Sequence, residues 1–75
     1  MKRLDVTTMT TGQILIYQKR IREEQIEWRH LRSDYKGNDL EAYRTAVDEL
    51  AHLALCAEDA YIELDRRENE KVHRM

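Results

Sequence analysis

The residue spacing in this chain that is best suited to chemistry is Glu49-Leu50-Ala51-His52. A Glu-x-x-His step places a carboxylate and an imidazole one turn apart on a helix, and di-iron sites in helical bundles use this step. Glu24 lies far enough upstream to reach the same level if the chain folds back as a hairpin. Glu24, Glu49 and His52 are therefore the candidate metal ligands. The position of Leu50 argues against a metal site. If Leu50 points into the hairpin, Glu49 lies on the flank of the helix and His52 on its outer side. We expect no metal and no other cofactor.

Two further sets of residues are candidate catalytic groups, but the rest of the sequence lacks the partner residues that either would need. Glu23-Glu24-x-x-Glu27 resembles the first carboxylate motif of the helical nucleotide pyrophosphohydrolases. Their second motif, Glu-x-x-Asp, is absent from the second half of the chain, so Mg²⁺ would lack ligands. Cys56 lies in an apolar run, with no His expected near it on its own helix face and no helix N-terminus close by, so we do not expect it to act as a nucleophile. The sequence predicts a protein that is not an enzyme.

Two apolar stripes with helical spacing account for most of the chain. Steps of three and four residues indicate a helix over 11–35 and a second over 39–72, joined by a turn at 36–39. The first stripe consists of Ile14, Tyr17, Ile21, Glu24, Trp28, Leu31 and Tyr35. The second consists of Leu40, Tyr43, Val47, Leu50, Ala54, Ala57, Tyr61 and Leu64, with Ala46, Leu53 and Ala60 widening it on one side. The predicted fold is all-α, an antiparallel two-helix hairpin over 11–75 that follows a flexible arm over 1–10.

Residues at the expected helix ends support these boundaries. Thr10 and Gln13 have the spacing of a capping box, in which each side chain bonds the backbone of the other residue. Gly37 lies where a helix end favours a left-handed residue. Asn38 is the expected cap of the second helix, with Glu41 in its first turn.

The composition indicates that the hairpin associates with another chain. The 75 residues include 37% charged residues, two Gly and no Pro, which is typical of long helices washed by solvent. Residues 1–38 carry a net charge of +3 and residues 39–75 a net charge of −5. In so small a domain, apolar burial offsets little more than the chain entropy. We therefore expect a homodimer that forms a four-helix bundle, with a basic first helix and an acidic second helix attracting each other.

Several apolar residues lie outside the predicted stripes. Scattered surface apolar residues are normal, but a hairpin that needs a partner favours a contact surface. The candidate protein interface consists of Leu15, Ile16, Ile26, Leu55 and Ile62.

The charged residues form two further candidate surfaces. Arg22, Arg29, Arg32 and Lys36 follow one flank of the first helix and could hold phosphates. This layout is similar to that of the small plasmid copy-control proteins, which bind RNA hairpins as two-helix dimers. The face expected to point away from the hairpin carries a mostly acidic set of residues. These are Glu41, Asp48, His52, Asp59 and Glu63.

The favoured function is a small non-enzymatic adaptor or regulator, of the kind that phages and accessory operons encode, which binds itself and another protein. The alternatives are a nucleic-acid-binding dimer, a ferritin-like metal-binding hairpin and a secretion co-chaperone. The last rests on 31–34, the turn at 36–39 and Tyr43, which resemble the two-helix co-chaperones of type III secretion needle subunits. A single cysteine fits a cytoplasmic location. We expect no membrane span, since no apolar run approaches the required length.

Overall fold

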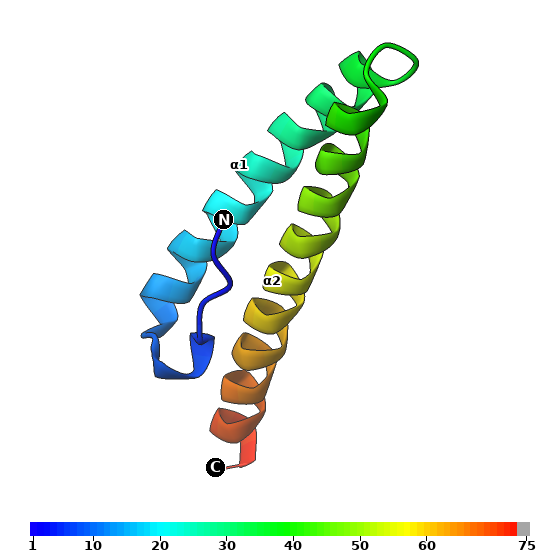
Figure 1. The fold of residues 1–75 in the computed structure, drawn as a ribbon. Helices are drawn as coiled ribbons and strands as arrows, with labels where there is room; N and C mark the ends of the chain where they lie inside the picture. The colour runs from blue at the N-terminus through cyan, green and yellow to red at the C-terminus, as the bar shows by residue number, and fades with distance from the viewer. Residues whose placement is uncertain (74–75) are drawn as a thin grey trace.

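The computed structural model describes residues 1–73, which fold into two long antiparallel helices with a short N-terminal arm laid against them (Figure 1). Helix α1 spans Thr11–Tyr35 and helix α2 spans Leu40–His73, while η1, a single turn of 3-10 helix, spans Val6–Thr8. The molecule is a rod of about 56 × 16 × 16 Å. The predicted all-α hairpin is confirmed.

Helix α1 begins at the predicted capping box. The Gln13 backbone N–H donates to Thr10 Oγ1 at 3.1 Å, and the Thr10 backbone N–H donates to Gln13 Oε1 at 2.8 Å. Two amide groups that would otherwise lack a partner at the helix start are thereby bonded. This boundary is decided by residues three positions apart, so the sequence alone could predict it.

In the turn between the helices, Gly37 has its predicted left-handed role, whereas Asn38 does not have its predicted role as the cap of α2. Gly37 has a φ of +84°, a left-handed conformation that glycine adopts without steric cost. The cap of α2 is Asp39, whose Oδ1 accepts from the Ala42 backbone N–H at 3.1 Å. Asn38 turns back and donates its side-chain amide to the Asp34 backbone oxygen at 3.1 Å. The prediction of Asn38 as the cap was therefore wrong by one residue, because Asn38 instead bonds a free carbonyl at the end of α1.

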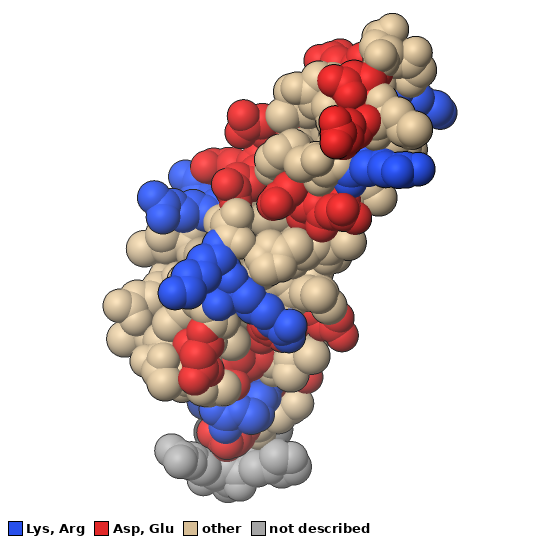
Figure 2. All heavy atoms as spheres, in the orientation of Figure 1, with Lys and Arg blue, Asp and Glu red and all other residues tan. Residues whose placement is uncertain are grey.

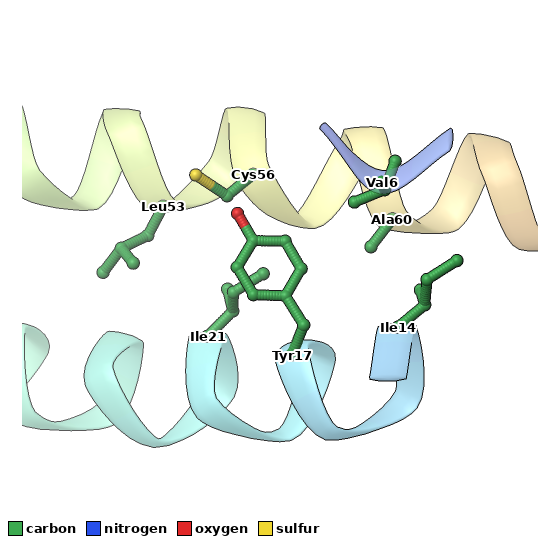
Figure 3. Close-up of a cluster of buried hydrophobic side chains, with 7 residues drawn as sticks. All are labelled: Val6, Ile14, Tyr17, Ile21, Leu53, Cys56 and Ala60. Atoms are coloured by element: carbon green, nitrogen blue, oxygen red, sulfur yellow. The ribbon is translucent and has the colours of Figure 1, made fainter. Parts of the chain in front are cut away.

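The core cluster, drawn in Figure 3, is formed by residues 6, 14–21 and 53–60, which lie away from the turn at 36–39. Ile14 and Ile21 of α1 are fully buried, and Tyr17 is almost so. They pack against Leu53, Cys56 and Ala60 of α2, which are also fully buried. The predicted stripe of α1 is confirmed by this arrangement, and its later members Trp28, Leu31 and Tyr35 are half-buried.

The predicted stripe of α2 is wrong in its rotation about the helix axis. Val47 and Tyr61 are 39% and 66% exposed, and Ala54 is exposed as well. The buried residues are instead Ala46, Leu53 and Ala60, which the sequence placed at one edge, together with Cys56. The buried face is therefore turned toward the arm, whose Val6 is only 5% exposed and packs into the same cluster.

Residues 1–10 contact the hairpin throughout much of their length. Val6 belongs to the core cluster, and Met1 and Met9 pack against it. The Asp5 side chain caps η1 by accepting from the Thr7 backbone N–H at 3.1 Å. The arm therefore packs against residues of both α1 and α2 (Figure 1). The structure gives the position of the arm and not its motion, so the flexibility of residues 1–10 stays a prediction.

Candidate functional site

One side chain, Arg67, joins the arm to the far end of α2. Its guanidinium donates to the backbone oxygens of Val6 and Met9 and to Thr11 Oγ1. Its Nε donates to Glu63 Oε1 at 2.9 Å. The rigid fork of an arginine suits this task, since its donors point in several directions at once. Arg67 thus connects the arm, the start of α1 and α2.

Glu63 completes this junction and is 4% exposed. Arg66 and Arg67 both donate to its carboxylate, with Arg66 Nη2 at 2.6 Å from Oε1. Hydrogen bonds from Arg66 and then from Arg67 outweigh desolvation and lower the pKa of Glu63 from 4.5 to about 2. The sequence placed Glu63 on an open acidic face, which was wrong. The neighbouring arginines stabilise a buried carboxylate that the helical wheel alone could not locate.

A second contact, between Arg3 and Asp59, holds the beginning of the arm. Arg3 donates twice to the Asp59 carboxylate, with Nε at 2.7 Å from Oδ2 and Nη2 at 3.0 Å from Oδ1. The hydrogen bond from Arg3 lowers the pKa of Asp59. The sequence predicted an acidic surface pointing away from the hairpin. Of its carboxylates, Glu41 and Asp48 are exposed, whereas Asp59 and Glu63 bind arginines.

His52 is half-buried beneath the arm and does not point outward as the sequence suggested. Its Nε2 lies 2.6 Å from the Met1 backbone oxygen and 3.8 Å from Cys56 Sγ. The expectation that Cys56 has no histidine neighbour was therefore wrong, because one helical turn separates the two residues on the same flank. The Tyr17 hydroxyl, which accepts from the Leu4 backbone N–H at 3.4 Å, points toward the same place (Figure 3).

The candidate metal ligands are not brought together. Within the described part of the chain, no three His, Cys, Asp or Glu side chains are arranged to hold a metal ion. Glu49 lies 4.0 Å from the N-terminal amine, and His52 bonds the Met1 backbone. Glu24 lines a hollow between the arm and α1. The geometry therefore gives no support to the ferritin-like alternative.

The five predicted interface residues are all exposed, but they lie on more than one face. Leu15, Ile16 and Ile26 of α1 are 53%, 66% and 54% exposed. Leu55 and Ile62 of α2 are 46% and 56% exposed. Leu55 and Ile62 point away from α1, because on the helical wheel they lie nearly opposite the buried residues. We call the surface formed by Leu55 and Ile62 the outer face.

A second exposed surface lies opposite the arm, and we call it the stripe face. Two residues correspond to about 200° around a helix, so residues two positions from an arm contact point to the other side. In α2, Ala54 and Tyr61 follow the arm contacts His52 and Asp59 by two positions. In α1, Leu15 and Ile26 stand in the same relation to Tyr17, which bonds the arm, and Glu24, which lines the hollow beside it. The stripe face comprises Leu15, Ile26, Leu40, Val47, Ala54 and Tyr61.

The basic residues of α1 extend along the same side of the hairpin. Arg22, Arg29, Arg32 and Lys36 are exposed, and none of them takes part in an ion pair within the described residues. The opposite side differs, because Figure 2 shows acidic side chains gathered near the turn and basic ones near the middle of the rod. The four cations are therefore available to an anionic partner.

Comparison with known proteins identifies no relative of this chain. No family model matches the chain, and no curated protein or solved structure is significantly similar to it. Neither helix, over the residues that the structure describes, has an apolar stretch long enough to cross a membrane. The exposed apolar residues indicate a partner interface.

Proposed function

We propose that this protein is a small non-enzymatic adaptor or regulator, of the kind encoded by phages and accessory operons, that acts as a four-helix homodimer and binds a second protein through its helix faces. One observation carries the proposal. The accessible surface is 5910 Å², whereas a folded monomer of 9.1 kDa is expected to expose about 4,900 Å². The excess of about 1,000 Å² is comparable to the area that each partner buries in a standard protein interface.

The outer face is the surface proposed to bind the second protein. Leu55 and Ile62 are spaced seven residues apart, which places them on one side of α2 about two turns from each other. Apolar anchors at this spacing are suited to a groove or a helix in another protein. A partner that exposes an apolar helix face would present such a complement.

Changing both anchors to Asp tests this proposal. The tagged chain with Leu55→Asp and Ile62→Asp is expected to keep its helical circular dichroism and to lose a protein that the unchanged chain captures from its native cells. The control carries Thr45→Asp and Asn69→Asp, which add the same charge at exposed positions of α2. Equal capture by the test variant and the control would refute the role of this face.

Nucleic-acid binding is the second candidate, and the four unpaired cations of α1 favour it. A phosphate backbone would bind Arg22, Arg29, Arg32 and Lys36 with an affinity that falls steeply as salt rises. A mobility shift of duplex RNA at low salt, lost when the four become Glu, would support this candidate. The absence of any shift at low salt would remove it.

A further inference from the structure

We propose that the stripe face joins two copies of this chain around a two-fold axis parallel to the long axis of the rod, so that α1 of each copy packs on α2 of the other. This inference rests on the homodimer proposed above and names its surface and orientation. It does not depend on the outer face, which stays exposed in such a dimer.

The apolar residues of the two helices match each other in height along the rod. Ile14 of α1 faces Ala60 of α2, and Ile21 faces Leu53 (Figure 3). An axis parallel to the rod leaves every residue of the second copy at the height of its equivalent in the first. Leu15 of one copy then lies near Tyr61 of the other, and Ile26 lies beside Val47. Exposed apolar residues of both helices are thereby covered together, whereas Ile16, Leu55 and Ile62 remain outside this contact.

The charges flanking the stripe face are complementary in the same arrangement. Near Leu15 and Ile26, the flank of α1 carries Lys19, Arg22 and Arg29, all of them exposed. The corresponding flank of α2 carries Glu58 and Asp65. Lys19 lies at the height of residue 55, about one helical turn from Glu58 of the other copy. Packing α1 on α2 places cations beside carboxylates, whereas packing α1 on α1 would bring the cations together.

The shape of α2 also permits a second helix to approach it here. In the middle of the α2 part of the stripe face, Ala54 is flanked by the small residues Ala51 and Ala57, while Leu40 and Tyr61 lie at its ends. Small side chains allow two helix axes to come closer, and the larger end residues then pack around the neighbouring helix. The surface is therefore shaped for a helix of matching length.

The first experiment measures solution mass by sedimentation equilibrium over a concentration series of the full chain. We expect a dimer, and we expect Val47→Asp with Tyr61→Asp to give a helical monomer. The matched control is Leu55→Asp with Ile62→Asp, which removes equivalent apolar residues from the outer face and should leave the dimer intact. A monomeric unchanged chain, or a dimer that the control dissociates and the test variant does not, would overturn the proposal.

A charge exchange examines the pairing of α1 with α2. Lys19→Glu alone and Glu58→Lys alone are each expected to weaken dimerisation by about threefold to fivefold, the combined effect of the two exposed ion pairs that the two-fold axis creates. The two changes together should restore the affinity. Additive weakening in the double variant would contradict this pairing.

The orientation is measured with a nitroxide spin label at Lys36→Cys in a Cys56→Ala background. An axis parallel to the rod puts both turns at the same end, so the distance between labels should be comparable to the 16 Å width of the hairpin. A distance approaching the 56 Å length would show an antiparallel dimer and refute the proposed axis. A dimer with the other orientation would refute this inference alone, whereas a monomer would also refute the homodimer of the proposed function. Neither result would affect the outer-face experiment, which tests the binding of a second protein.

Discussion

The Nε2 atom of His52 lies 2.6 Å from the backbone oxygen of Met1, although 51 positions separate the two residues. Because a carbonyl oxygen can only accept a hydrogen bond, Nε2 carries the proton in this contact. The buried thiol of Cys56 lies one turn further along α2, with its Sγ 3.8 Å from the same nitrogen. The start of the chain is therefore held over the single cysteine of the protein.

The reactivity of Cys56 should report whether the arm is in place. Val6→Asp is expected to raise the rate of thiol labelling under native conditions about tenfold, because it removes about 1.5 kcal/mol of apolar burial that holds the arm closed. Thr8→Asp, at an exposed position of η1, is the control and should leave the rate unchanged. Labelling kinetics with a maleimide measure both, and equal rates would mean that the arm does not protect Cys56.

Replacing Arg67 should detach the arm from α2. Arg67→Ala removes the guanidinium that donates to the Met9 backbone oxygen, to Thr11 Oγ1 and, alongside the Met9 backbone N–H, to the Val6 backbone oxygen. We expect a loss of about 1–3 kcal/mol in the free energy of unfolding. Arg67→Lys should restore little of it, since an ammonium group cannot reach all these acceptors.

Arg66 provides the matched control for that experiment. Its side chain is 51% exposed and binds Glu63 and Glu70 within α2, without contacting the arm. Urea unfolding should show a smaller effect for Arg66→Ala than for Arg67→Ala. The reverse order would contradict the assignment of Arg67 as the anchor of the arm.

The stability should fall in acid through the titration of Glu63. Its pKa is lowered from 4.5 to about 2 in the folded protein, so its contribution to stability is fully present above pH 4.5. The contribution is lost as the pH falls from about 4.5 to 2, because the unfolded chain binds a proton there and the folded chain does not. Urea unfolding at several pH values should show this slope. Glu63→Gln should flatten it, and a variant with the unchanged slope would count against the assignment.

The two glycines should respond to alanine in opposite directions. Gly37→Ala is expected to destabilise the protein by about 1 kcal/mol, because a residue with a side chain is strained at φ +84°. Gly12 lies in α1, and a methyl group there would meet nothing closer than Thr10 Oγ1 at 4.0 Å. Gly12→Ala should therefore raise the melting temperature by reducing the entropy of the unfolded chain. Thermal unfolding measures both, and a melting temperature unaffected by Gly37→Ala would argue against the left-handed turn.

The buried side of α2 shows where sequence reasoning reached its limit. Val47, Ala54 and Tyr61 recur every seven residues, and so do Ala46, Leu53 and Ala60, one position earlier. Either set satisfies the helical period, and one position turns the helix by only about 100°. Nothing within α2 distinguishes the two sets, so the sequence could predict a stripe but not which of its edges is buried.

The helices, the capping box of Thr10 with Gln13, and the left-handed Gly37 were determined by the sequence alone, because each depends on residues within a few positions of one another. The tertiary structure alone decided the placement of the arm, the burial of Glu63, and the contact of His52 with Met1. The arm and the His52 contact depend on groups more than 50 residues apart along the chain. Glu63 bonds Arg66 and Arg67 in the next turn, but its partner Arg67 is in turn held by the arm. Hydrogen bonds over such separations follow from how α2 is rotated, and the burial of Val6 and the four bonds of Arg67 stabilise that rotation.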